Sequence, residues 1–140
     1  MTWVAIVVVA GLGFWWWQQS GAYVTTSDVD DLAFGNDNIF LSEFQGNQLV
    51  ESPLVLSGEA IGPWYFEASF PIELKDGNGL VIADTIGEAQ GDWMVNTFVP
   101  FTATLTFATP ATPSGTLILH KENPSGEPAY DDELIIPITF

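Results

Sequence analysis

The sequence predicts an all-β protein: one antiparallel β-sandwich preceded by a hydrophobic N-terminal helix. Residues 3–17 contain no charged or polar side chain. From residue 38 onward, short runs rich in β-branched and aromatic residues alternate with Gly, Pro, Asn and Asp, at the spacing of strands and turns in a sandwich. No apolar pattern of helical period follows Trp17. We therefore expect a helix, a linker and a single β-domain.

The N-terminal block, residues 1–17, has the composition of a segment that is removed from water. As a helix it would be about 25 Å long, which is short but sufficient for a bilayer core of ~30 Å. Its three consecutive tryptophans lie where an interfacial aromatic belt would lie. The residues that we expect to contact a membrane or an assembly are Trp3, Val8, Trp15, Trp16 and Trp17.

Three interpretations of this block are considered. The favoured one is a single-pass membrane anchor that holds the following domain on the extracytoplasmic side. The second is an apolar stalk that packs with copies of itself in an extracellular filament. The third is a cleaved signal peptide, which fits less well because the block has no basic n-region and no clear small-x-small cleavage site.

Residues 18–37 read as a linker and residues 38–140 as the sandwich domain, because strand-like runs begin only after Asn38. A domain of about 100 residues is large enough for one modest core. Turn residues separate seven runs of strand-like composition. The runs are 39–41, 54–58, 64–74, 80–89, 98–107, 116–119 and 134–140.

Local patterns support several of these strands. Residues 76–79, Asp-Gly-Asn-Gly, predict a hairpin, since Asn and Gly tolerate the positive φ of a primed turn. Residues 102–107 alternate Thr with apolar residues, which is typical of a strand with one buried face. Pro71, Pro100 and Pro137 interrupt runs and favour edge strands or bulges at those points.

The charge balance excludes one class of partner. The chain has 18 Asp and Glu against two Lys and Arg, giving a net charge of −16. Binding to nucleic acid requires several cations to neutralise phosphates, so we expect no nucleic-acid partner. Anionic lipid headgroups should repel the domain. The absence of cysteine removes disulfides and thiol catalysis.

The motifs that follow residue 38 resemble, in order, the immunoglobulin-like domain of bacterial spore-germination proteins, the Gmad2 domain. The resemblance implies an immunoglobulin-like β-sandwich on the outer side of the membrane, attached through an N-terminal anchor, with a binding or adhesion role and no catalytic residues. The germination domain that accompanies it in spore proteins is not found in this sequence. The motifs are S-P-L-V-L-S-G-E-A at 52–60, W-Y-F-E-A-S-F-P at 64–71, L-K-D-G-N-G at 74–79, A-Q-G-D-W-M at 89–94, F-V-P-F-T-A-T-L-T-F at 98–107 and E-N-P-S-G-E-P at 122–128.

No arrangement of residues indicates an enzyme. His120 is the only histidine, and no nucleophile-elbow pattern accompanies it, so we expect an exposed strand histidine. Glu67 and Glu73 are read as two solvent-facing acids and not as a glycosidase pair. We expect no cofactor; Ca²⁺ binding at the oxygen-rich segments 30–31, 76–78 and 131–133 is the alternative, although none of them has the Asp-x-Asp-x-Asp-Gly pattern.

The candidate ligand-binding residues are Trp64, Glu122 and Asn123. Alternating burial predicts that at least half of the aromatic cluster formed by residues 64–66 and Trp93 is core, with Trp64 the member most exposed. The loop at 122–128 is stiffened by two prolines, and loops on rigid scaffolds commonly carry binding residues.

These observations predict a membrane-anchored, extracytoplasmic binding or adhesion module of the cell envelope, whose partner is a glycan or a protein. The alternative is a structural subunit of a surface filament or envelope complex, assembled through its apolar N-terminal helix. Oligomeric state distinguishes the two, because only the second requires the block to pack with copies of itself.

Overall fold

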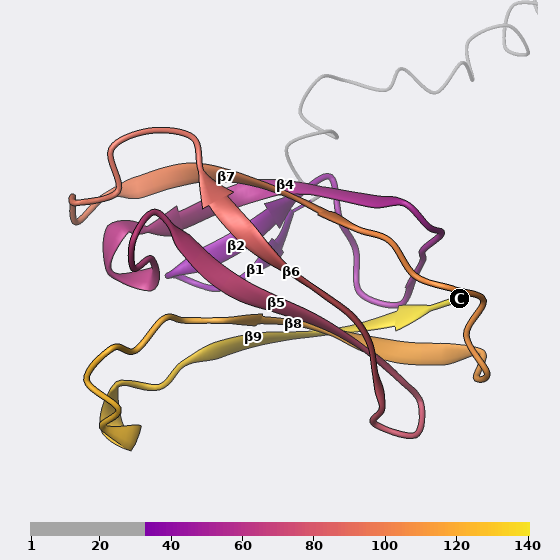
Figure 1. Ribbon diagram of the computed structural model, residues 1–140. Helices are drawn as coiled ribbons and strands as arrows, with labels where there is room; N and C mark the ends of the chain where they lie inside the picture. Colours follow the sequence, from indigo (N-terminus) through magenta and orange to yellow (C-terminus); the bar gives the residue numbers. More distant parts are fainter. Residues whose placement is uncertain (1–32) are drawn as a thin grey trace, which may run out of the picture.

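The structure is a computed structural model that describes residues 33–140 (Figure 1). The predicted N-terminal helix and all but the last five residues of the predicted linker lie outside the described residues. Among the described residues, none forms a helix that is both long and apolar enough to cross a membrane.

Nine β-strands and two short 3-10 turns account for the regular structure of residues 33–140. They are β1 (Ala33–Gly35), β2 (Ile39–Ser42), β3 (Gln48–Leu49), β4 (Leu54–Ile61), η2 (Gly62–Trp64), β5 (Ser69–Asp76), β6 (Val81–Ala89), β7 (Phe98–Leu105), β8 (Ser114–His120), η3 (Pro128–Tyr130) and β9 (Glu133–Thr139).

The strands are hydrogen-bonded in the order β1-β2-β4-β7-β6-β5-β8-β9-β3, and this ribbon folds over into two facing layers (Figure 1). Strands β2, β4 and β7 lie in one layer and β5, β8 and β9 in the other. Strand β6 pairs with β5 along most of its length and reaches β7 only through Glu88 and Ala89. All pairs are antiparallel except β3 with β9. The predicted all-β sandwich is therefore confirmed.

Each of the seven predicted strands contributes to a strand of the structure, whereas β1 and β3 were not predicted. Strand β1 lies inside the predicted linker 18–37, so the sheet begins before residue 38. The predicted run 64–74 was too long at its start, because residues 62–64 form the turn η2 and β5 begins only at Ser69.

The core lies between the two layers, and in β2, β4, β5, β7 and β9 every second residue enters it. In β7 the buried residues Val99, Phe101, Ala103 and Leu105 alternate with exposed ones, as the Thr-rich pattern predicted. Phe70 from β5 meets Phe101 edge-to-face, with ring centroids 4.9 Å apart. Burying each such large side chain contributes roughly 1.5–3 kcal/mol, so these contacts across the layers hold the sandwich closed.

The predicted hairpin at residues 76–79 joins β5 to β6. The buried carboxylate of Asp76 accepts hydrogen bonds from the backbone N–H groups of Asn78 (2.9 Å) and Leu80 (3.0 Å). Gly79 has φ +80°, a conformation that side chains disfavour. The predicted hairpin is therefore confirmed, but the turn is not a primed turn, because Gly79 is its only residue with a positive φ and Asn78 has none.

The three strand prolines were expected at edge strands or bulges, and that expectation was wrong: β5, β7 and β9 each have a neighbour on both sides. Each proline instead lies immediately before the point where pairing on one side begins. Pairing of β5 with β8 starts at residue 72, of β7 with β6 at residue 101, and of β9 with β3 at residue 138. No backbone N–H is needed on that side, so proline is tolerated inside the sheet.

Candidate functional site

Three loops meet at one end of the sandwich, which we call the loop end (Figure 1). They are the β4–β5 loop (62–68), the β6–β7 loop (90–97) and the β8–β9 loop (121–132). Backbone hydrogen bonds join them: the N–H of Gly62 donates to the carbonyl of Thr97 (3.1 Å), and the N–H of Glu122 donates to the carbonyl of Trp64 (3.0 Å). The loops are therefore held as one surface.

At Gly62 the backbone of the β4–β5 loop lies very close to the backbone of the β6–β7 loop. A Cβ atom added at Gly62 would overlap the carbonyl oxygen of Val95 and crowd that of Trp93. Only glycine allows the β4–β5 and β6–β7 loops to lie this close, so this residue sets the position of Trp93.

The expected exposure of Trp64 was wrong, because its side chain is completely buried. Residues 62–64 form a 3-10 turn instead of the start of a strand, and the turn leaves Pro63 exposed while Trp64 enters the core. A buried ring cannot act as a stacking platform for a sugar. The indole Nε1 of Trp64 is buried without a hydrogen-bond partner.

Tyr65, the next residue, is also buried and anchors the loop to β7. Its hydroxyl donates a hydrogen bond of 2.6 Å to the carbonyl of Val99. Burial away from water raises the pKa of the Tyr65 hydroxyl far above its ordinary value. The side chain is therefore a neutral structural donor under Phe66.

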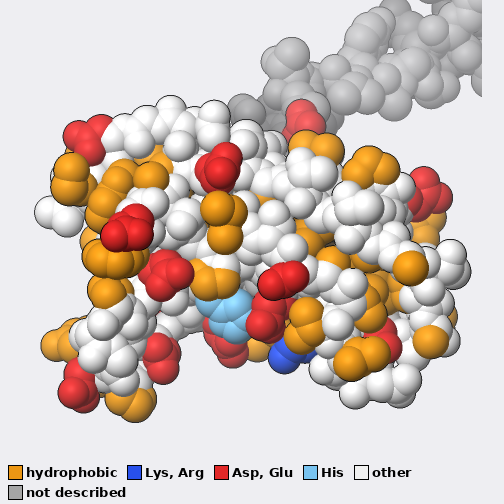
Figure 2. Space-filling model, in the orientation of Figure 1, with side chains coloured by type: hydrophobic (Ala, Val, Ile, Leu, Met, Phe, Trp, Pro, Cys, Tyr) orange, Lys and Arg blue, Asp and Glu red, His pale blue; other side chains and the backbone are white. Residues whose placement is uncertain are grey.

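Phe66, Trp93 and Met94 form the part of the exposed apolar surface of the loop end that we call the loop-end patch; Tyr130 of the β8–β9 loop is exposed as well. Phe66 is 42% exposed and Met94 76% exposed, while Trp93 is partly buried. The rings of Phe66 and Trp93 meet edge-to-face at 6.4 Å. Beside them, Pro63 and Met94 border a hollow of about 250 Å³. Figure 2 shows hydrophobic side chains gathered at this end, the left of the view, with carboxylates around them.

Phe66 is presented by a two-residue turn in a disfavoured conformation. Glu67 (φ 51°) and Ala68 (φ 64°) both lie in the left-handed region. The backbones of Phe66 and Ser69 exchange two hydrogen bonds, 3.0 and 3.2 Å long, around them. Two successive positive φ angles define a primed hairpin turn, which normally contains Asn-Gly. Glu-Ala is a costly sequence for this turn, and such local strain is concentrated at functional sites.

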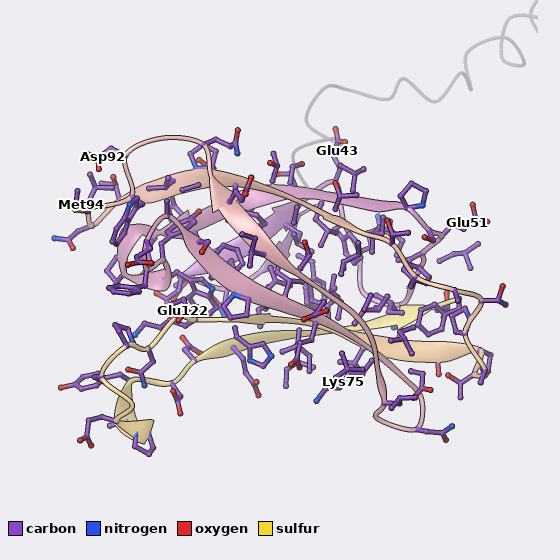
Figure 3. All side chains as sticks on the ribbon, viewed as in Figure 1. Glu43, Glu51, Lys75, Asp92, Met94 and Glu122 are labelled. Carbon is purple, nitrogen blue, oxygen red and sulfur yellow. The ribbon has the colours of Figure 1, made fainter. Side chains whose placement is uncertain are left out.

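The β8–β9 loop contains the other two predicted ligand-binding residues. The side-chain amide of Asn123 donates to the carbonyl of Glu127 and to the carboxylate of Asp131, both at 2.8 Å, so its amide N–H groups hold the loop in shape. Glu122 is partly exposed and lies at the loop end, where its backbone contacts Trp64 (Figure 3). The structure thus brings the three predicted residues together, with Trp64 and Asn123 in supporting positions.

The loop end is strongly acidic. Its three loops contain six carboxylates and one lysine. The ammonium group of that lysine, Lys121, donates a hydrogen bond of 3.0 Å to the carbonyl of Tyr130. Asp92 lies beside Met94 in Figure 3, whereas Glu43 and Glu51 lie on other parts of the molecule. The loop-end patch is therefore bordered by negative charge.

His120 lies outside the patch, on the outer face of the second layer. It is half-buried and not exposed as expected: its Nε2 is 3.3 Å from Glu73, and its Nδ1 is 3.5 Å from Glu133. Lys75 lies 3.9 Å from the same Glu73 carboxylate. Both ring nitrogens thus face carboxylates, and such partly exposed pairs contribute about 1 kcal/mol or less. Within residues 33–140, no set of three or more His, Asp or Glu side chains is placed to hold a metal ion.

Met94 and the turn at 67–68 were not identified from the sequence. The signal for Met94 was available, because the run from Gly91 to Asn96 lies between two strands and contains two large apolar side chains. No signal marked the turn, since neither Glu nor Ala favours a positive φ.

The strand order and the comparisons with known proteins both agree with an immunoglobulin-like fold. In immunoglobulin sandwiches, strands A, B and E of one sheet face strands C, F and G of the other. Strands β2-β4-β7 and β5-β8-β9 follow these two orders, and β6 is attached mainly to β5. No curated protein and no solved structure gave a significant match. The family model of the immunoglobulin-like domain of bacterial spore germination, Gmad2, matches residues 39–127, more than half of the sequence. The chain belongs to the Gmad2 family of immunoglobulin-like domains.

Proposed function

We propose that this chain is a membrane-anchored, extracytoplasmic module of the cell envelope that binds or adheres to a partner through its loop end. The observation that carries the proposal is the loop-end patch: three large apolar side chains on loops that hydrogen bonds and buried residues hold in place. Exposed apolar side chains on rigid loops are typical of binding surfaces. No catalytic step is part of the proposal.

The anchoring part of the proposal rests on the sequence. Residues 3–17 are uncharged and apolar, as a membrane anchor requires. The course of β1 is consistent with it: Gly35 pairs with Phe40 near the loop end, and Ala33 pairs with Ser42 farther away. Strand β1 therefore runs toward the loop end, with Ala33 at its end away from the loops, and this direction is compatible with a loop end that faces away from the membrane.

Fractionation of cells that express the full chain tests the proposal. We expect the protein in the membrane pellet after alkaline carbonate washing, and we expect protease added to intact cells to digest the domain. The variant Val8→Asp should move the protein out of the pellet, since a carboxylate in a bilayer interior costs several kcal/mol. Val55→Asp, an exposed site on β4, is the matched control and should leave fractionation unchanged. Full chain that is soluble and monomeric would contradict the anchor.

The apolar block also supports the second candidate, a filament or envelope subunit assembled through residues 3–17. In that case the full chain should form regular polymers visible by electron microscopy without lipid or detergent. Val8→Asp should then yield monomers, because the packed apolar stalk cannot accept an unpaired charge. Monodisperse protein in detergent micelles would favour the anchor.

A further inference from the structure

We propose that the loop-end patch recognises a protein segment in which an exposed apolar side chain is flanked by Lys or Arg. This inference rests on the proposed binding function and names the chemistry of its partner. It uses two separate features of the loop end: the apolar patch with its hollow, and the carboxylates around them.

The apolar part of the partner is inferred from the patch itself. The rings of Phe66 and Trp93 pack edge-to-face, and the exposed, flexible thioether of Met94 follows Trp93 in the same loop. The adjoining hollow of about 250 Å³ lies between Pro63 and Met94 and is large enough for one side chain of the partner. Aromatic residues and Met are the types enriched at the centres of protein interfaces.

The cationic part is inferred from the charges around the patch. Glu67 follows Phe66 directly, and Asp92 precedes Trp93 directly, so each aromatic residue has an exposed carboxylate next to it. The one lysine of the three loops, Lys121, is held by the carbonyl of Tyr130. Complementary charges across an interface speed association and select partners, so Lys or Arg beside the apolar group fits this surface.

The same charges argue against two other occupants. Residues 33–140 contain 15 acidic residues and two lysines, so a second copy of the chain would bring a like-charged surface to the patch. An anionic lipid surface would be repelled for the same reason. A neutral glycan could stack on the rings and donate hydroxyl hydrogen bonds to the carboxylates, but it carries no positive charge to complement them.

The test uses the full chain in nanodiscs of neutral lipid, with empty nanodiscs as the blank. A phage-displayed library of random twelve-residue peptides is selected on the protein. We expect the selected peptides to be enriched in aromatic or large aliphatic residues next to Lys or Arg. Isothermal titration then gives the affinity of the best peptide for each variant.

Phe66→Ser combined with Met94→Ser should weaken the binding of that peptide at least tenfold. The matched control, Val55→Ser combined with Leu80→Ser, removes two other exposed apolar side chains and should leave the affinity within twofold. Glu67→Gln with Asp92→Asn should weaken binding about threefold to tenfold at low salt and flatten its salt dependence. Glu43→Gln with Glu51→Gln removes the same charge elsewhere and should have a smaller effect.

Three results would overturn the inference: selection of neutral or acidic peptides, an affinity that the patch variants leave unchanged, or selection of no peptide at all. Titration with soluble, uncharged cell-wall sugar oligomers separates this failure from failure of the proposed function. If the oligomers bind the wild type but not the variant Phe66→Ser/Met94→Ser, the loop end is still a binding site, but the cationic partner is refuted. Soluble, monomeric full chain in the fractionation experiment would refute the proposed function itself.

Discussion

Replacing Glu67-Ala68 with Asn-Gly should stabilise the domain by about 1–1.5 kcal/mol. A non-glycine residue in the left-handed region costs roughly 1–2 kcal/mol, and both residues lie there. Glycine at residue 68 removes this cost but loses about 0.5–1 kcal/mol through the greater freedom of the unfolded chain. Asparagine at residue 67 tolerates the conformation better than glutamate. The melting temperature should rise by roughly 4–8 °C for a domain of this size.

Urea and thermal unfolding of the full chain in neutral detergent, followed by near-ultraviolet circular dichroism, measures this change. Two glycine variants serve as controls, because an added Cβ meets no atom within 4 Å at either site. Gly79→Ala, at φ +80°, should destabilise by about 1 kcal/mol through the backbone alone. Gly91→Ala has no such φ and should be neutral or slightly stabilising.

The reasoning fails if the Asn-Gly variant is no more stable than wild type while Gly79→Ala is destabilised as expected. That combination would show that Glu67 and Ala68 are not held at positive φ in solution. The Asn-Gly variant is also compared with Glu67→Gln, which removes only the charge. If the Asn-Gly variant is more stable than wild type and binds the selected peptide more weakly than Glu67→Gln does, the strained turn sets the shape of the patch in addition to supplying the Glu67 carboxylate.

Three further predictions concern the residues beneath the loops. Tyr65→Phe should destabilise by about 1–3 kcal/mol, because the buried carbonyl of Val99 loses its donor. Tyrosine in the unfolded chain ionises near pH 10, whereas folded Tyr65 stays protonated. The free energy of unfolding of the wild type should therefore fall above about pH 10, by up to ~1.4 kcal/mol per pH unit. Urea titrations at a series of pH values should show a smaller decrease with pH for Tyr65→Phe. Gly62→Ala should destabilise by roughly 1–3 kcal/mol or more and shift the near-ultraviolet dichroism of the tryptophans, since the new methyl group overlaps Val95. Asn123→Ala should raise amide hydrogen exchange at 124–131 and leave the core strands protected, because its two hydrogen bonds lie within the loop.

The sequence predicted best those parts of the fold in which local chemistry and tertiary structure agree. The hairpin at 76–79 was predicted from its Asn and Gly, and Gly79 does take the positive φ that the turn requires, whereas the two hydrogen bonds to the Asp76 carboxylate were not predicted. The strand at 98–105 was predicted because every second residue enters the core. In contrast, β1 and β3 are three and two residues long, and their pairing partners, not their own composition, make them strands.

The loop end was harder to predict because its residues depart from local preference. The burial of Trp64 follows from the 3-10 turn, whereas the period-two pattern assumed a strand. The turn at 67–68 contains no residue that favours positive φ, so only the surrounding pairing imposes it. A surface loop at 122–128 could be predicted from its prolines, but the role of Asn123 within the loop could not.

The hairpin of β1 and β2 determines how the domain responds to a pulling force. Tension on Ala33 directed away from the loop end acts along β1 and loads its three residue pairs with β2 in shear. When these pairs separate, residues 33–38 straighten, and the distance from Ala33 to Ile39 along the pulling direction grows from roughly 10 Å to roughly 20 Å. The load then reaches Ile39, which is completely buried and paired with Ala60. The edge hairpin is thus a short extensible element, which yields before the hydrophobic core bears the tension.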